Sequence, residues 1–298
     1  MSFVQWTSKS LAHLVEALAS KGHQIKKSAL ADILHDLGFA LRANKKTIEG
    51  TSHPARDAQF EQINSKGKQF EQRGDPIISV DCQKKELLGT FKNNGAEWQV
   101  KGEDTRVNVY DFLSLADGKA VPYGIYDLIH TSGFVNVGID HDTAEFAVES
   151  IRRWWQQSGK ALYPGKKELL ITADGGGSNG TRNRLVARKS SRTRANEEQL
   201  AITVVQYPPA TSKWNKIEHR LFSFISINWR AKPLTSLEVV LELISHTTTK
   251  EGLAVTAVKD SNTYLTGLKI SDDELAALNL SKDSFHGEWN DTISPQHA

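Results

Sequence analysis

Two short stretches near the N-terminus carry apolar residues three and four positions apart, the spacing that places side chains on one face of a helix. The apolar positions are Leu11, Leu14, Val15 and Leu18 in the first stretch, and Leu30, Ile33, Leu34 and Leu37 in the second. Ser8 or Ser10 can cap the first helix and Ser28 the second, while Gly22 and Gly38 follow them. Two amphipathic helices with a tight link are typical of a helix-turn-helix, and a generic helical hairpin remains the alternative.

A helix-turn-helix reads DNA with the N-terminal end of its second helix, which enters the major groove. In this chain that end carries Lys26, Lys27 and Ser28. We therefore expect these side chains to contact DNA if the helix-turn-helix interpretation holds.

Beyond a polar, basic linker over residues 40–54, the pattern changes from helical to strand-like. A helix with Phe60, Ile63 and Phe70 on one face comes first and ends at Gly74-Asp75-Pro76. Apolar, β-branched runs then follow, and such runs predict buried strands. The predicted strands are Ile77–Cys82, with a continuation or partner over Glu86–Phe91, then Tyr123–Ile129, Phe134–Ile139, Leu169–Ala173 and Leu200–Gln206.

Turn and helix-cap signals indicate how these strands are connected. Thr131-Ser132-Gly133 predicts a hairpin turn. The capping box Asp142-Thr143-Ala144-Glu145, with its first residue as the cap, begins a helix that brings Trp154-Trp155 into the core. Ser212 can cap a further helix over Lys213–Asn228. The order of the elements predicts a mixed sheet with helices on its faces, which is an α/β layer fold.

Three carboxylates stand where a metal site could assemble. Asp81 and Asp174 each end an apolar strand, and Glu218 lies one turn inside the last predicted helix. Mg²⁺ prefers oxygen ligands and is usually held by carboxylates together with substrate phosphates, and two such ions can clamp a phosphoryl transfer. An aspartate at a strand end is more often a turn or cap residue, but all three together match the RNase H-like plan of nucleotidyl transferases.

Side chains around Glu218 suit nucleic acid. Lys213, Lys216 and Arg220 could hold phosphates, and Trp214 could stack on a splayed base or serve as a packing residue. The glycine-rich loop over residues 175–180 allows close approach of a phosphate, although a plain flexible connection is the alternative. The loop lacks the Lys-Ser/Thr ending of a P-loop, which excludes nucleotide hydrolysis and a nucleotide cofactor.

Composition narrows the class of protein. The hydrophobic content of 39% and charged content of 24% are ordinary for a soluble globular protein. No apolar stretch approaches the roughly 20 residues needed to span a bilayer, so no membrane role is expected. Cys82 is the single cysteine, which excludes an intramolecular disulfide and fits a reducing cytoplasm. The net charge of +2 is uninformative by itself, but its distribution is uneven, with an acidic tail after Ser271. The basic clusters at Lys26-Lys27, Arg42–Lys46 and Arg182–Arg194 are compatible with phosphate contacts, and solvated faces are the alternative.

Four stretches together resemble one protein family. They include ISVDCQKKE around Asp81, GFVNVGIDHDTAEFAVESIRRWW, LLITADGGGSNG around Asp174, and PPATSKWNKIEHRLFSFISINWR around Glu218. These motifs are similar to those of the DDE transposases of bacterial insertion sequences, and most of all to the Rhodopirellula-type DDE transposase family. The resemblance extends from Trp6 to Pro295.

The resemblance implies an RNase H-like catalytic core behind a helix-turn-helix module, with Asp81, Asp174 and Glu218 as the triad that binds two Mg²⁺ or Mn²⁺ ions. It implies cleavage of double-stranded DNA at element ends and joining of the freed 3′-hydroxyl to target DNA, by a homo-oligomer in the bacterial cytoplasm, associated with the nucleoid. The expected parts are a DNA-binding module (1–50), a linker helix (51–76), the catalytic domain (77–260) and an acidic tail packed on or beside the core (261–298).

The chain departs from the family pattern in three places. It begins just before Trp6, where relatives extend further. The segment Val186–Glu198 has almost no apolar stripe, although the corresponding helix should cover the sheet. Cys82 and Gly175 stand where threonine and alanine are expected. Two alternatives therefore remain: a truncated or degenerate copy that only binds DNA, and an RNase H-like nuclease without strand transfer.

Overall fold

The computed structural model describes residues 9–40, 53–176, 198–268, 271, 273 and 279–295. The chain divides into two compact units, Met1–Glu49 and Gly50–Ala298. The first unit holds the two predicted N-terminal helices, and the second holds the strands and the other helices.

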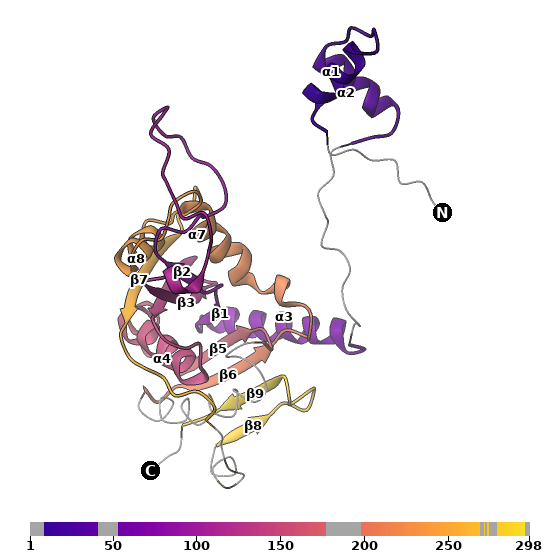
Figure 1. The fold of residues 1–298 in the computed structure, drawn as a ribbon. Coiled ribbons are helices and arrows are strands. Elements are labelled where there is room, and N and C mark those ends of the chain that lie inside the picture. The colour runs from indigo at the N-terminus through magenta and orange to yellow at the C-terminus, as the bar shows by residue number, and fades with distance from the viewer. Residues whose placement is uncertain are drawn as a thin grey trace. The chain divides into compact units, whose positions relative to one another are not determined.

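The first unit contains a helix pair, as predicted from the N-terminal pattern (Figure 1). Helix α1 spans Leu11–Ala19, and the hydroxyl of Ser10 caps it by accepting a backbone N–H of its first turn at 3.3 Å. Helix α2 spans Lys27–Asp36. The prediction that Ser28 caps α2 is wrong, because Lys26 takes the N-cap position in an extended conformation and leaves Ser28 inside the first turn.

The second unit is built on a mixed sheet that has nine strands within the described residues. Its order is β7-β4-β3-β1-β5-β6-β9-β8, with β2 paired to β3 outside this path. The strands span Ile77–Cys82 (β1), Glu86–Leu88 (β2), Gly118–Asp127 (β3), Ser132–Gly138 (β4), Glu168–Ala173 (β5), Ala201–Gln206 (β6), Ala254–Asp260 (β7), Leu280–Lys282 (β8) and Asn290–Ile293 (β9). Strands β4, β3 and β1 are antiparallel neighbours, and β5 and β6 continue the sheet parallel to β1. This arrangement confirms the predicted RNase H-like α/β fold.

The predicted strands are present, with differences at their ends. Strand β1 has the predicted bounds, whereas the short β2 pairs with β3. The hairpin of β3 and β4 is confirmed, but its turn comes earlier than predicted, so Ser132 and Gly133 belong to β4. Asp127 explains the shift, because its Oδ1 accepts hydrogen bonds from the backbone N–H groups of Ile129 at 2.9 Å and His130 at 3.0 Å.

Helices cover both faces of the sheet (Figure 1). Side chains of neighbouring strand residues point to opposite faces. Ile78 of β1 packs in one cluster with Trp154 of helix α4, which spans Ala144–Trp154. The adjacent Ile77 packs in another cluster with Phe70 of the long helix α3. Helices α4 and α3 therefore lie on opposite faces, and the prediction that Trp154-Trp155 is core is confirmed by exposures of 1% and 5%.

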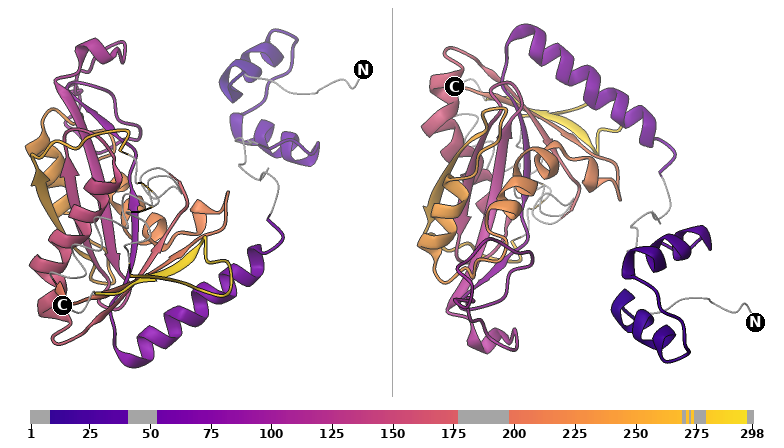
Figure 2. Two further views of the ribbon diagram at one scale, coloured as in Figure 1. Left: turned by 90° about the horizontal axis from the view of Figure 1, so that it is seen from below. Right: turned by 90° about the horizontal axis from the view of Figure 1, so that it is seen from above.

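Helix α3 spans Arg56–Arg73 and runs alongside the C-terminal strands in both views of Figure 2. Its Gln59 exchanges two hydrogen bonds of 2.8 Å with Asn290 of β9 and donates a third, of 2.7 Å, to the carbonyl of Gln206 in β6. Lys66 adds an ion pair of 3.2 Å with Asp283. The sequence pattern does not predict β7, β8 or β9, and the last two extend the sheet where only an acidic tail was expected.

Two helix starts differ from their predictions. The cap of α4 is Thr143, whose hydroxyl accepts the Phe146 backbone N–H at 3.2 Å, so the prediction that Asp142 is the cap is wrong. The helix predicted from Lys213 is interrupted. Its pieces are a 3-10 turn, η4 (Ser212–Trp214), a π-helical turn, η5 (Glu218–Phe222), and α7 (Ser223–Asn228), with α8 (Leu237–Ser245) following. No helix in the described ranges is long and apolar enough to cross a membrane.

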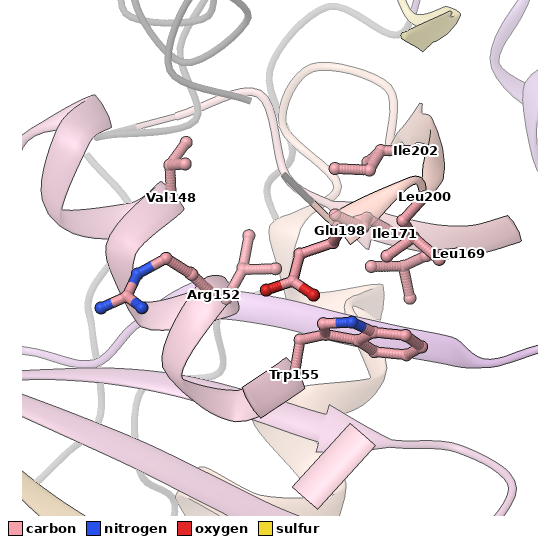
Figure 3. Close-up of a pocket in the computed structure, with 9 residues that line it drawn as sticks. Val148, Arg152, Trp155, Leu169, Ile171, Glu198, Leu200 and Ile202 are labelled. Carbon is pink, nitrogen blue, oxygen red and sulfur yellow. The ribbon is translucent and has the colours of Figure 1, made fainter. Parts of the chain in front are cut away.

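An apolar pocket of about 30 Å³ lies between α4 and strands β5 and β6 (Figure 3). Ile171 and Ile202 line it from the strands, and Trp155 and Glu198 line its other sides. Of the segment Val186–Glu198, which lacks the expected apolar stripe, only Glu198 is among the described residues.

Candidate active site

Strand pairing places two of the predicted carboxylates side by side. Strands β1 and β5 are parallel, and Val80 pairs with Ala173 in their register. Asp81 and Asp174 are the next residues on the two chains. Both carboxylates are therefore carried to the same edge of the sheet by adjacent strands, as the sequence predicts.

Glu218 is brought to this edge by a buried hydrogen-bonded connection, which we name the Ser79–Asn215 clamp. The Ser79 hydroxyl donates to Asn215 Oδ1 at 2.5 Å and accepts the Ile217 backbone N–H at 3.1 Å. Asn215 Nδ2 donates to the carbonyl of Val80 at 3.1 Å. The clamp thus ties the residue before Glu218 to the strand that carries Asp81.

The clamp also explains the interrupted helix. Asn215 adopts an extended conformation with φ −60° and ψ 125°, and its side chain is fully buried against β1. A residue held in this way cannot continue the helical turn Ser212–Trp214, so a new turn begins after it. Glu218 then opens the π-helical turn η5, a distortion that is frequent at functional sites.

A glycine opposite Asp81 lets η5 lie close to the sheet. Gly124 of β3 pairs with Asp81 of β1. A Cβ atom at Gly124 would lie 2.4 Å from Phe222 Cε1 and 2.9 Å from Ile217 Cδ1. Because real Cβ atoms do not approach so closely, any other residue at this position would force the side chains of Phe222 and Ile217, on the segment that carries Glu218, to shift.

The three carboxylates share one electrostatic environment. Burial, together with the charges of Asp174 and Glu218, raises the pKa of Asp81 to about 8, although hydrogen bonds from the Cys82 backbone and the Asn215 side chain act to lower it. The Cys82 backbone N–H donates to Asp81 Oδ1 at 2.7 Å. Burial also raises the pKa of Glu218, where His219 opposes the shift and Asp174 adds to it. Like charges thus disfavour the ionised triad, and a bound cation would relieve that repulsion.

The donor set fits a hard divalent cation. Carboxylate oxygens are the ligands that Mg²⁺ and Mn²⁺ prefer, and such ions are normally completed by phosphates and water. Within the described residues, no group of three His, Cys, Asp or Glu side chains is close enough to hold an ion by itself. The chemistry of Asp81, Asp174 and Glu218 therefore fits the predicted metal, while the carboxylates do not form a closed cluster.

The predicted DNA-contacting residues fall into two groups. Lys213, Trp214 and Lys216 are solvent-accessible on the segment that leads into η5, and Arg220 is solvent-accessible within η5, two residues after Glu218. Trp214 is half exposed, and Lys213 Nζ lies 5.5 Å from the centre of its ring.

Lys26, Lys27 and Ser28 belong to the first unit, where they are exposed at the start of α2. Of the glycine loop, only Gly175 and Gly176 lie within the described residues, and Gly176 donates its N–H to Asp174 Oδ1 at 3.3 Å. The basic cluster Arg182–Arg194 lies outside them.

Sequence reasoning missed the residues that position Glu218. Ser79 is the polar residue inside the apolar run Ile77–Val80, and that interruption was a usable signal. Asn215 was only part of a quoted motif, because a single asparagine does not reveal a partner far away in sequence. Gly124 carried no signal, since its role depends on a helix that arrives almost a hundred residues later.

Solved structures of one transposase resemble this chain weakly. The Mos1 transposase paired-end complex with left transposon end aligns with a TM-score of 0.46 and 10% identity, covering 81% of this chain and 71% of that chain. The Mos1 strand transfer complex gives 0.44 and 12%, with the same coverage. The mariner Mos1 paired-end complex with Mg gives 0.46 and 10%, covering 81% and 72%. These values assign no role to any residue here, and no curated protein matches the sequence significantly.

The sequence itself matches a family model over nearly its whole length. The model is described as the Rhodopirellula transposase DDE domain, and it matches residues 1–295. The matched range contains the strand-end aspartates, the clamp and Glu218, and it confirms the resemblance noted from the motifs. The chain therefore belongs to the Rhodopirellula transposase DDE domain family.

Proposed function

We propose that this protein is a divalent-metal-dependent transposase that cuts DNA at the ends of its element and joins the freed 3′-hydroxyl to target DNA. The observation that carries the proposal is the shared edge of β1 and β5, where Asp81 and Asp174 follow a register pair and the Ser79–Asn215 clamp adds Glu218.

Asp81, Asp174 and Glu218 would hold Mg²⁺ or Mn²⁺, and we propose two ions. When bound, such ions lower the pKa of an attacking water or 3′-hydroxyl and stabilise the leaving oxygen. No nucleophile from the protein is needed.

The remaining residues orient the DNA. Lys213, Lys216 and Arg220 would hold the phosphates next to the scissile bond, since they are exposed beside Glu218. Lys26 and Lys27 would contact a DNA duplex through α2. We further propose that the chain acts as a homo-oligomer on paired element ends, in the cytoplasm where bacterial DNA lies, with the domain boundaries expected from the sequence.

Nicking of supercoiled plasmid DNA tests the site without knowledge of the element ends. We expect the protein to nick plasmid in Mn²⁺ or Mg²⁺ and not in EDTA. Asp81→Asn, Asp174→Asn and Glu218→Gln should each lower the rate by roughly a hundredfold or more, because each removes a metal ligand. Asp111→Asn, which neutralises an exposed carboxylate in the loop before β3, should leave the rate unchanged. Nicking that survives all three changes, or that needs no metal, would overturn the proposal.

Product analysis separates transposition from simple hydrolysis. A labelled oligonucleotide with a free 3′-hydroxyl should become covalently joined to plasmid in the presence of Mn²⁺. Nicking without any joining would identify a nuclease. Duplex binding with no nicking in any metal would identify a copy that only binds DNA.

A further inference from the structure

A groove of about 570 Å³ runs between helix α3 and the segment that leads into Glu218. This volume is within the range of small-molecule and cofactor sites. Its floor is apolar and comes from Ile63 of α3, Ile77 of β1 and Leu128. Tyr207 and the half-exposed Trp214 form an aromatic wall.

The groove lies on the same face of the sheet as the carboxylates. Side chains two residues apart on a strand share a face and stand about 7 Å apart. Ile77 shares its face of β1 with Asp81, and Thr172, which lines the groove from β5, lies two residues before Asp174. Lys216, also in the groove, lies two residues before Glu218. The groove therefore leads away from the candidate active site along one face.

The aromatic wall is held in place by the protein. The ring centre of Phe60 on α3 lies 6.4 Å from that of Trp214 in an edge-on contact and 5.9 Å from that of Tyr207 in a tilted contact. Burial raises the pKa of Tyr207, against hydrogen bonds from the Thr172 hydroxyl and the Lys216 backbone N–H that lower it. A neutral, fixed phenol and a fixed indole offer planar surfaces at low entropic cost.

The rim of the groove is more basic than acidic. Lys68 of α3 and Lys216 are exposed on opposite sides, and neither forms an ion pair in the described part of the chain. Glu71 is the acidic residue of the lining, and Asn64 adds a neutral amide. Basic side chains around an apolar, aromatic floor complement a strand that has charged phosphates and planar bases.

We propose that this groove binds unpaired nucleobases of the DNA strand next to the scissile phosphate, with Trp214 as the stacking surface and Lys68 and Lys216 as phosphate contacts. This inference rests on the proposed function, because it makes the groove an extension of the same active site. The bases of a duplex are paired and stacked, so they cannot stack on Trp214. The strand is therefore unpaired where it occupies the groove.

Binding of the full chain to a fluorescent thymidine 12-mer tests the proposal, with an abasic 12-mer of the same backbone as the comparison. Fluorescence anisotropy is measured in EDTA, so the result does not depend on metal or cleavage. The thymidine strand should bind more tightly, and Trp214→Ala should weaken it by about tenfold without affecting the abasic strand. Trp214→Phe should restore most of the difference, since it keeps a planar ring.

Two controls identify the groove as the site. Trp98→Ala removes a fully exposed tryptophan that is not part of the groove lining. This variant should not change the affinity for either strand. Lys68→Ala should lower the affinity for both strands equally and reduce the salt dependence of binding, because it removes a phosphate contact. Equal affinity for the two strands, or a preference that survives Trp214→Ala, would overturn the proposal.

A photocrosslink gives a second reading that does not depend on variants. A 12-mer with 5-iododeoxyuridine should crosslink to a peptide that contains Tyr207 or Trp214, and crosslinks confined to other peptides would contradict binding in the groove.

The experiments distinguish failure of the groove proposal from failure of the proposed function. Base-dependent binding without plasmid nicking would leave the groove standing and remove the proposed function, while nicking without base-dependent binding would do the opposite.

Discussion

At the scale of single residues, the candidate site depends on polar side chains that are completely buried. Ser79 and Asn215 have 0% exposure, and each has its hydrogen bonds satisfied by the other or by the backbone. A buried polar group is costly when it loses its partner and nearly neutral when it is paired. The clamp can therefore fix Glu218 at a defined place on β1 without a net cost in stability.

Replacing Asn215 with leucine should separate Glu218 from β1. The change removes the acceptor of the Ser79 hydroxyl and the side-chain donor to the Val80 carbonyl, so the free energy of unfolding should fall by about 1–3 kcal/mol. Plasmid nicking should fall by about tenfold or more at a temperature where the variant is fully folded, because a positioned ligand is lost. Chemical denaturation and the nicking rate together measure the two effects.

Asn228 provides the matched control for this change. Its Nδ2 donates to the Leu243 carbonyl at 2.5 Å, which ties α7 to α8 rather than to the strand that carries Asp81. Asn228→Leu should cost similar stability and leave nicking intact. If both asparagine variants lose activity in proportion to stability, the clamp has no positioning role.

At the scale of elements, the site depends on how closely one helical turn approaches the sheet. Gly124 and Gly133 lie under η5, where added Cβ atoms would stand 2.4 Å from Phe222 and 2.6 Å from Leu221. The turn sits in the space that these glycines leave open. This single π-helical turn carries both Glu218 and the buried Leu221.

Gly124→Ala should force η5 away from β3. Overpacking of a dense core costs about 1–3 kcal/mol, so the melting temperature should fall, and Mn²⁺ affinity measured by calorimetry should fall with it. Adding Phe222→Leu should recover part of both losses, because it removes the ring atoms that clash. If the double variant instead loses the sum of the two single-variant losses in melting temperature and Mn²⁺ affinity, the predicted clash between Gly124→Ala and Phe222 is contradicted.

Gly67 is the control within the same unit. It lies in α3 with nothing within 4 Å of an added Cβ atom. Gly67→Ala should stabilise the protein by up to about 1 kcal/mol through helix propensity and leave Mn²⁺ binding unchanged.

At the scale of the whole molecule, the chain separates into a small helical unit and a large sheet unit. The basic residues at the start of α2 belong to the small unit, and the carboxylates belong to the large one. Division of this kind allows DNA binding and catalysis to be tested separately.

The double change Lys26→Ala and Lys27→Ala should weaken binding to a 30-base-pair duplex. Loss of two phosphate contacts lowers the slope of log affinity against log salt by roughly 2. Plasmid nicking at high protein concentration should persist, because the carboxylates are untouched. The corresponding pair Lys101→Ala and Lys250→Ala, exposed in the large unit, should change neither quantity, and an unchanged slope in the first pair would contradict a DNA contact at α2.

The sequence by itself determined the elements that carry short-range signals. Alternation and β-branched runs locate β1, β5 and β6, and the position of an aspartate at the end of a run already places Asp81 and Asp174 at a sheet edge. The family motifs added Glu218. Local errors arose where two residues competed for one role, as when Thr143 and not Asp142 capped α4.

Tertiary structure alone decided how these parts meet. The register that sets Val80 against Ala173, the clamp across 136 residues between Ser79 and Asn215, and the glycine opposite Asp81 are all contacts between distant segments. The C-terminal strands β8 and β9 gave no clear pattern because they are short. Strand β9 gains stability from pairing with β6 and from Gln59, and β8 gains it from pairing with β9. Local sequence specifies the period and the ends of an element, whereas its neighbours follow from long-range packing, which no local window contains.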